Sequence, residues 1–283
     1  MQSEMTQEHN NLFVFEAIGT RWWIENLDQR PIPAVVQDNI LEYVQQFDER
    51  YSRFKQKSFV SLLQRGERIS DPPSEFIDIL RFARDLYHAS DGQFNVSIGG
   101  KLHAQGYGKR ADAAPTYSNP WKYIHFEKRE VYLDEEMMID IGGFGKGWLI
   151  DKISSLLSGS NINQYIVNGG GYMYVCSNLP ISIAIEDPHD SEKMYGKRQI
   201  SNQALAVSSH DKRFWYDQAT KRSHIQSIED KSQITDPPKG VIVTAQNATL
   251  ADAIATVLML DPGLATNLHQ KYNFQSKISI KNY

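Results

Sequence analysis

The sequence predicts an α+β fold in which mixed and antiparallel sheets pack against helices in one compact unit. Short runs of β-branched and aromatic residues follow one another with few helical segments between them, which favours this class over a doubly wound α/β arrangement. The chain shows neither a repeat of fixed period nor a low-complexity linker. We therefore expect residues 12–283 to form one domain behind a polar, disordered N-terminal tail, residues 1–11.

Composition narrows the classes of function. Hydrophobic residues make up 41% and charged residues 23% of the 283 residues, which is typical of a globular protein. A formal net charge of -4 argues against a nucleic-acid partner. Cys176 is the only cysteine, so neither an internal disulfide nor a cysteine-based zinc site can form. The apolar runs are too short for a membrane span.

The first residues bear on localisation. Residues 1–5 contain neither a basic n-region nor an apolar h-region, so the sequence shows no signal peptide. We expect a cytoplasmic protein, or a periplasmic one if a leader has been removed.

Periodicity and breaker residues predict the individual elements. Apolar side chains spaced by three or four residues predict helices, and β-branched or aromatic runs bounded by Gly, Pro or Asp predict strands. In the first half we expect a strand over 13–25 broken at Gly19-Thr20, a loop or short turn over 51–63 and a loop over 94–108. We also expect a helix after Pro31 and Pro33, whose apolar face carries Val36, Ile40, Val44, Phe47 and Tyr51. A second helix is expected from 71–74 to Asp91-Gly92, and its inward-facing residues are Phe76, Ile79, Leu80, Ala83 and Leu86. In the second half we expect a short antiparallel pair at 123–126 and 130–133, and further strands at 137–141, 164–168, 172–176, 181–185, 205–207, 241–244 and 278–280. The expected helices are at 147–157, from Asn247 or Thr249 to Leu260, and at 264–269. Residues 211–240 are expected to be polar and irregular.

A glycine-rich stretch precedes the helix at 147–157. Glycines occupy positions 142, 143, 145 and 147, and Lys146 lies among them. Glycine permits a close approach of backbone to ligand, and a helix N-terminus offers N–H groups to an anion, so the stretch is typical of a phosphate or pyrophosphate site. The spacing matches neither the P-loop nor the dinucleotide fingerprint. The alternative is a simple turn with a solvated Lys146.

Asp252 and Thr256 are separated by one helical turn, so their side chains share a helix face. A carboxylate and a hydroxyl are hard oxygen ligands suited to Mg²⁺. The alternative is structural, because Asp near a helix N-terminus stabilises the dipole and Thr often packs in a core. The small side chains of Ala251, Ala253 and Ala255 favour close approach of a ligand or a second element.

His224 lies in the polar segment between two expected strands. Its ordinary pKa is close to neutrality, so it is a candidate for proton transfer; the alternative is a solvated loop histidine. The sequence contains neither a G-x-S-x-G elbow nor an H-E-x-x-H motif.

Taken in order over roughly residues 13–260, a series of motifs resembles the ApbE-like FAD:protein FMN transferases. The resemblance is carried by Ile18-Gly19-Thr20 (M-G-T in the family), Ser52-Arg53-Phe54-Lys55 with Ser58 (S-T-Y-R…S), Asp91-Gly92-Gln93-Phe94-Asn95 (D-G-A-F-D), the stretch from Asp140 to Asp151 (D-L-G-G-I-A-K-G-x-x-x-D), Asn168 with Gly170 and Gly171 (N-x-G-G), and Ala251 to Thr256 (A-D-A-L-A-T). The stretch from Asp140 to Asp151 is the most specific match.

The resemblance implies an ApbE-like, T-fold-related fold and a Mg²⁺-dependent reaction. In this reaction the FMN moiety of FAD is transferred to a Thr or Ser hydroxyl of an acceptor flavoprotein, and AMP is released. In the implied site, Asp140 and Lys146 contact FAD, and the Gly143 carbonyl, Asp252 and Thr256 surround Mg²⁺. The flavin and adenosine sites are lined by Ile18, Phe54, Gln93, Phe94 and Asn95. His224 and Ile225 lie near the pyrophosphate, and His224 is the candidate base.

The chain departs from the family pattern at several positions. Asn95 and Tyr172 stand where acidic residues are expected, Ser209 replaces the glycine of T-S-G, and Ser227 replaces the aspartate of H-I-x-D-P. These changes leave the metal and phosphate motifs intact. Two alternative functions remain open: an FAD pyrophosphatase that gives FMN and AMP, and an FAD-binding protein without turnover.

Overall fold

The computed structural model describes residues 10–108, 114–127, 129–187, 190–210, 214–217, 220–228 and 238–279. It confirms the predicted α+β class: strands and helices interleave along the chain, and each strand pairing among the described residues is antiparallel. The expected disordered tail lies almost entirely outside these residues. The described helices are α1 (Ala34–Tyr51), α2 (Phe59–Gln64), α3 (Ser74–Ala89), α4 (Gly99–Ala104), α5 (Gly145–Gly159), α6 (Ala248–Leu260) and α7 (Ala265–Lys271), with short 3₁₀ turns at Val96–Ile98, Pro120–Lys122 and Pro262–Leu264.

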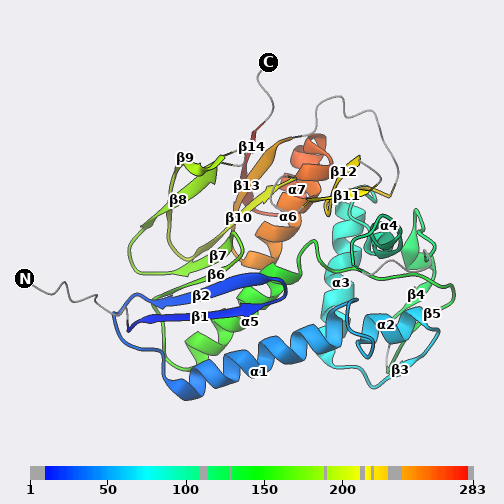
Figure 1. Ribbon diagram of the computed structural model, residues 1–283, viewed down its shortest axis with the longest axis horizontal. Coiled ribbons are helices and arrows are strands. Elements are labelled where there is room, and N and C mark those ends of the chain that lie inside the picture. The colour runs from blue at the N-terminus through cyan, green and yellow to red at the C-terminus, as the bar shows by residue number, and fades with distance from the viewer. Residues whose placement is uncertain are drawn as a thin grey trace, which may run out of the picture.

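A seven-stranded antiparallel sheet is the framework of the molecule (Figure 1). Its order is β1 (Leu12–Ala17), β2 (Thr20–Asn26), β6 (Tyr165–Gly169), β7 (Tyr172–Cys176), β10 (Gln203–Ser209), β13 (Gly240–Ala245) and β14 (Phe274–Ser279). In a three-stranded sheet, β5 (Glu130–Leu133) lies between β3 (Ile69–Ser70) and β4 (Ile124–His125). Two further two-stranded sheets pair β8 (Ile181–Asp187) with β9 (Asp190–Ile200) and β11 (Phe214–Asp217) with β12 (Thr220–Ser223).

The two faces of the large sheet are covered differently. Helices α5 and α6 pack on one face, where α6 contacts β10 and β13 and α5 contacts β6 and β7 (Figure 1). The β8–β9 ribbon covers part of the other face, where Ile185 packs with Leu205, Val207 and Ile242. The alternation of side chains along β10 explains this division, because successive residues of a strand point to opposite faces.

The two long amphipathic helices follow the sequence prediction. The buried residues of α1 and of α3 are those of the two predicted apolar stripes. A partly buried carboxylate joins them to α5: Glu75 accepts hydrogen bonds from Tyr43, from the Tyr51 hydroxyl at 3.0 Å and from Trp148 Nε1 at 3.1 Å. Burial and the neighbouring Glu75 carboxylate raise the pKa of Tyr43 and Tyr51, so both remain protonated donors.

Several expectations were wrong in detail. Residues 59–64 form α2 rather than a loop, because the Ser58 hydroxyl caps the Ser61 N–H at 3.2 Å. Residues 99–104 form α4 despite two glycines. The run at 137–141 is not a strand: its apolar side chains are buried, but the Asp140 N–H bonds to the Val96 carbonyl at 2.8 Å instead of to a sheet. Strand β9 and the β11–β12 hairpin were not expected. The short pair β4–β5 and the glycine break between β6 and β7 are confirmed.

Among the residues that the structure describes, none of the helices is long and apolar enough to cross a membrane.

Candidate functional site

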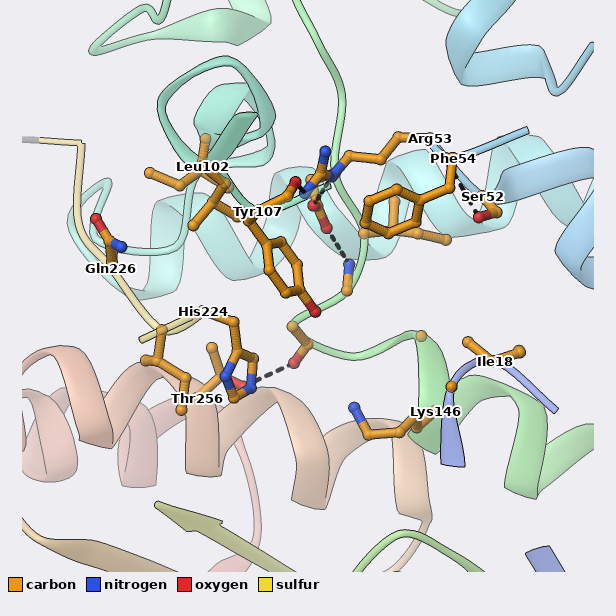
Figure 2. A pocket seen from close by; sticks show the side chains of 18 of the residues that line it. Ile18, Ser52, Arg53, Phe54, Leu102, Tyr107, Lys146, His224, Gln226 and Thr256 are labelled. Atoms are coloured by element: carbon orange, nitrogen blue, oxygen red, sulfur yellow. Dashed lines mark hydrogen bonds and ion pairs between the residues drawn. The ribbon is translucent and has the colours of Figure 1, made fainter. Parts of the chain in front are cut away.

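A cavity of about 780 Å³ lies where the β1–β2 turn, the end of α1, the 93–107 segment, the glycine-rich turn and α6 meet. Figure 2 shows Arg53 and Phe54 on one side of it, with Lys146 and Thr256 on the other. The structure brings nearly all of the predicted site residues to its wall: Ile18, Phe54, Gln93, Phe94, Asn95, Asp140, Gly143, Lys146, His224, Ile225 and Thr256. Asp252 is fully buried just behind the wall. Their assignment to FAD or metal stays a prediction.

Two of the three predicted metal ligands, Gly143 and Thr256, are in direct contact. The Thr256 hydroxyl donates to the Gly143 carbonyl at 2.9 Å, and Asp252 lies one turn before Thr256 on the same helix. A carboxylate, a hydroxyl and a carbonyl are oxygen donors of the kind that Mg²⁺ prefers, so these residues fit the ion.

Hydrogen bonds accepted by two carboxylates link α5 and α6. From α5, Asp151 accepts the N–H groups of Ala248 at 2.8 Å and Thr249 at 2.9 Å, and thereby caps α6. From α6, Asp252 accepts the Gly147 N–H at 3.0 Å. Gly147 has no room for a side chain, because a Cβ there would lie 2.2 Å from the Ala248 carbonyl oxygen. These hydrogen bonds fix α5, which bears Lys146, against α6, which bears the predicted metal ligands Asp252 and Thr256.

Lys146 lies in the first turn of α5 and is 8% exposed. Its ammonium is 4.5 Å from the centre of the Tyr172 ring, a cation–π contact, and the Tyr172 hydroxyl is 3.2 Å from Ser208 Oγ. A cation at a helix N-terminus is opposed by the helix dipole. Lys146 brings a positive charge to this part of the cavity wall, and its ammonium packs on Tyr172, where the family pattern has an acidic residue.

Asp140 is engaged by an arginine that was not among the predicted site residues. Arg53 Nε lies 2.6 Å from Asp140 Oδ2, and Asp140 Oδ1 accepts the Gly142 N–H at 2.6 Å. The guanidinium therefore balances the carboxylate charge inside the cavity wall. The position of Arg53 next to Phe54 in a matched motif was the available signal, but its pairing with a residue 87 positions away was not visible in the sequence.

The 93–95 segment is held by hydrogen bonds between the Asn95 side chain and residues outside the segment. Asn95 Oδ1 accepts the Ser97 N–H at 3.0 Å, and Asn95 Nδ2 donates to the Tyr117 carbonyl at 2.9 Å. The second bond needs an N–H donor, which explains an amide where the family pattern has a carboxylate. Phe94 packs so closely on Gly143 that a Cβ on Gly143 would lie 2.7 Å from its ring.

His224 and Ile225 follow the unexpected β11–β12 hairpin, in a loop tied to the far wall. Ser227 Oγ donates to Gln93 Oε1 at 3.2 Å, and Lys101 Nζ donates to the Ser227 carbonyl at 2.9 Å. The His224 ring centre is 6.5 Å from that of Tyr107. Ser227, a departure from the family motif, therefore anchors the loop that presents His224 to the cavity.

An aromatic wall completes the cavity. Tyr107 stacks on Trp215 with ring centres 4.9 Å apart and meets Phe54 edge-on at 5.8 Å. Tyr107 and Trp215 were missed because both lie in segments expected to be irregular. Ile18 enters from the β1–β2 turn with a φ of 50°, a conformation that is strained for a β-branched residue. Planar apolar walls of this kind suit a ring system such as a flavin or a purine.

The fold and the site define an α+β protein with a large cavity that has aromatic walls, a lysine and an oxygen donor set. Residues 18–273 match the ApbE family, and the chain belongs to this family. It is 22% identical over 265 residues to the FAD:protein FMN transferase of Vibrio cholerae, covering 86% of this chain and 79% of that protein. It is likewise 22% identical over 295 residues to the FAD:protein FMN transferase of Haemophilus influenzae, covering 94% and 85%.

Solved structures share the fold. The ApbE protein from Thermotoga maritima superposes with a TM-score of 0.78 at 18% identity and covers 96% of each chain. The flavin transferase ApbE from Vibrio cholerae gives a TM-score of 0.74 at 20% identity over 95% of this chain and 96% of that chain. The predicted ApbE-like fold is confirmed.

Proposed function

We propose that this protein transfers the FMN moiety of FAD to a Thr or Ser hydroxyl of an acceptor flavoprotein, with Mg²⁺ as cofactor and AMP as the second product. The observation that carries the proposal is that Lys146 and the contacting pair Gly143 and Thr256 line one aromatic-walled cavity, with Asp252 buried one turn before Thr256 on the same helix. The family membership and the relatives named FAD:protein FMN transferase support it.

The reaction forms one phosphorus–oxygen bond and breaks another. The acceptor oxygen attacks the phosphorus on the FMN side of the FAD diphosphate, the bond from this phosphorus to the bridging oxygen breaks, and AMP leaves. Lys146 and the α5 N-terminus stabilise the charge on the phosphate oxygens. When bound by Gly143, Asp252 and Thr256, Mg²⁺ would supply Lewis-acid stabilisation of the same charge.

His224 is the proposed acceptor of the hydroxyl proton. It lines the cavity beside Tyr107, on a loop fixed by Ser227. A neutral imidazole has the proton affinity that this step needs near neutral pH. The aromatic wall of Phe54, Tyr107 and Trp215 holds the planar part of FAD and limits access of water.

The proposal is tested by incubating the protein with FAD, Mg²⁺ and a flavin-acceptor domain and viewing a denaturing gel under ultraviolet light. A fluorescent acceptor band supports the proposed transfer. FMN and AMP free in solution with a dark acceptor band contradict it and favour an FAD pyrophosphatase. FAD that is bound but recovered intact contradicts turnover altogether. The acceptor domain with its Thr or Ser replaced by Ala is the matched control.

A further inference from the structure

The Arg53–Asp140 ion pair connects the two halves of the cavity. The Arg53 side chain is 4% exposed and that of Asp140 13% exposed, so the pair is almost entirely removed from water. Replacing a buried ion pair by apolar residues is often neutral or stabilising, so such a pair is weak evidence for a role in stability alone. Its position in the wall of the cavity calls for a role in the site.

On the polar side, Arg53 acts on the glycine-rich turn through Asp140. The guanidinium holds Asp140 Oδ2 at 2.6 Å, which directs Oδ1 to the Gly142 N–H. Gly142 is followed directly by Gly143, whose carbonyl accepts from Thr256. A continuous line of contacts therefore runs from Arg53 to the predicted metal donors.

On the aromatic side, the same guanidinium lies 4.2 Å from the centre of the Phe54 ring and 5.2 Å from that of Tyr107. Its Nη2 donates to the Tyr107 carbonyl at 3.1 Å. The planar fork of arginine supplies donors in several directions at once, which the single ammonium of lysine cannot do.

We propose that Arg53 is a positioning residue that sets the preference of the cavity for a diphosphate-bearing flavin; this inference rests on the proposed function. Arg53 holds Asp140 in place and balances its negative charge, so this carboxylate does not repel a diphosphate in the cavity. Without the guanidinium, Asp140 repels the diphosphate but has no charged group to repel in riboflavin.

The test compares the dissociation constants of FAD and riboflavin, measured by flavin fluorescence in the presence of Mg²⁺ and without acceptor. Arg53→Met is expected to weaken FAD binding by about tenfold or more and riboflavin binding by less than about threefold. Arg53→Met with Asp140→Asn removes the unbalanced carboxylate and is expected to recover most of the FAD affinity. Arg81→Met, which breaks the exposed Arg81–Asp78 pair at 3.2 Å, is the matched control.

Equal weakening of FAD and riboflavin without recovery in the double variant contradicts the proposal, because a general collapse of the cavity affects both ligands alike. An unchanged ratio in Arg53→Met also overturns it while leaving the proposed function intact. Wild-type protein that binds neither flavin overturns the proposed function as well. If Arg53→Met fails to fold, the ratio is measured on Arg53→Lys, where a shift of about threefold is expected and no shift contradicts the role.

Discussion

Asp252, a predicted Mg²⁺ ligand, is fully buried and accepts the Gly147 N–H. The Thr256 hydroxyl one turn later bonds to the Gly143 carbonyl. Metal binding is one way to balance the charge of a buried carboxylate.

Asp252→Ala is expected to abolish Mg²⁺-dependent turnover, because it removes the charged member of the donor set. Asp252→Asn keeps the volume and an oxygen acceptor for Gly147, and is expected to lose the Mg²⁺ response while remaining folded. The rate is measured against Mg²⁺ concentration, with thermal unfolding as a check of folding. Asp38→Ala, on the exposed face of α1, is the control. Undiminished activity in Asp252→Ala removes Asp252 from the metal site.

His224→Ala is expected to lower kcat by about 100-fold without changing the unfolding temperature, since general bases typically contribute 10²–10⁴-fold. The measurement is the rate of covalent flavin transfer at saturating FAD and acceptor. His88→Ala on the exposed end of α3 is the matched control. Wild-type turnover in His224→Ala means that another group activates the hydroxyl.

Individual residues could be predicted from the sequence where a motif marks them. Lys146, Asp252 and Thr256 lie in ordered motifs; Lys146 and Thr256 line the cavity and Asp252 is buried, while their roles stay a prediction. Arg53 and Tyr107 could not be found in this way, because their importance comes from partners distant in the chain. Asn95 could be located, but the reason for its amide is the Tyr117 carbonyl, which a sequence motif does not show.

At the scale of elements, the spacing of α5 and α6 sets the distance between Lys146 and the predicted metal ligands of α6, Asp252 and Thr256. Gly147→Ala is expected to destabilise the fold by about 1–3 kcal/mol, because its Cβ would lie 2.2 Å from the Ala248 carbonyl. Gly159→Ala, in the last turn of the same helix, meets nothing within 4 Å and is expected to be neutral or stabilising by up to about 1 kcal/mol. Chemical unfolding of both variants is the measurement, and equal effects would contradict the close packing of the two helices.

Asp151, the cap of α6, gives a pH-dependent prediction. Burial raises the pKa of its carboxyl above the ordinary value, against the hydrogen bonds from Thr249 and Ala248, which lower it. The folded state then binds the proton more tightly than the unfolded state does, so the contribution of this group to stability increases as pH falls through its raised pKa. Wild type is expected to gain stability relative to Asp151→Asn between about pH 7 and about pH 4. A difference in unfolding free energy that does not vary with pH would contradict this.

Long amphipathic helices were the most predictable elements, because each buries one stripe over several turns, as α1 and α3 do. Short elements were not: α2 spans six residues, too few to establish a period, and the glycines of α4 are weak helix formers. In α4 a tertiary contact outweighs the low helix propensity of glycine, because the backbone packs so closely that a Cβ on Gly100 would lie 2.1 Å from the Ala114 carbonyl oxygen. The apolar run at 137–141 resembled a strand because it is buried.

At the scale of the molecule, the large sheet supplies the β1–β2 turn and Tyr172, the helices supply Lys146 and Thr256, and the aromatic wall comes from the loops that carry Phe54 and Tyr107 and from Trp215 of β11. The cavity exists only where these parts meet. Its location could therefore be predicted from the sequence only through the resemblance to a family, and not from any one segment.

The central claim is that the acceptor becomes covalently flavinylated, and intact-protein mass spectrometry of the acceptor tests it most directly. After incubation with the protein, FAD and Mg²⁺, the acceptor is expected to gain the mass of FMN less one water, with AMP formed in equal amount. An acceptor of unchanged mass, in a mixture where FAD has been converted to free FMN and AMP, would contradict the account.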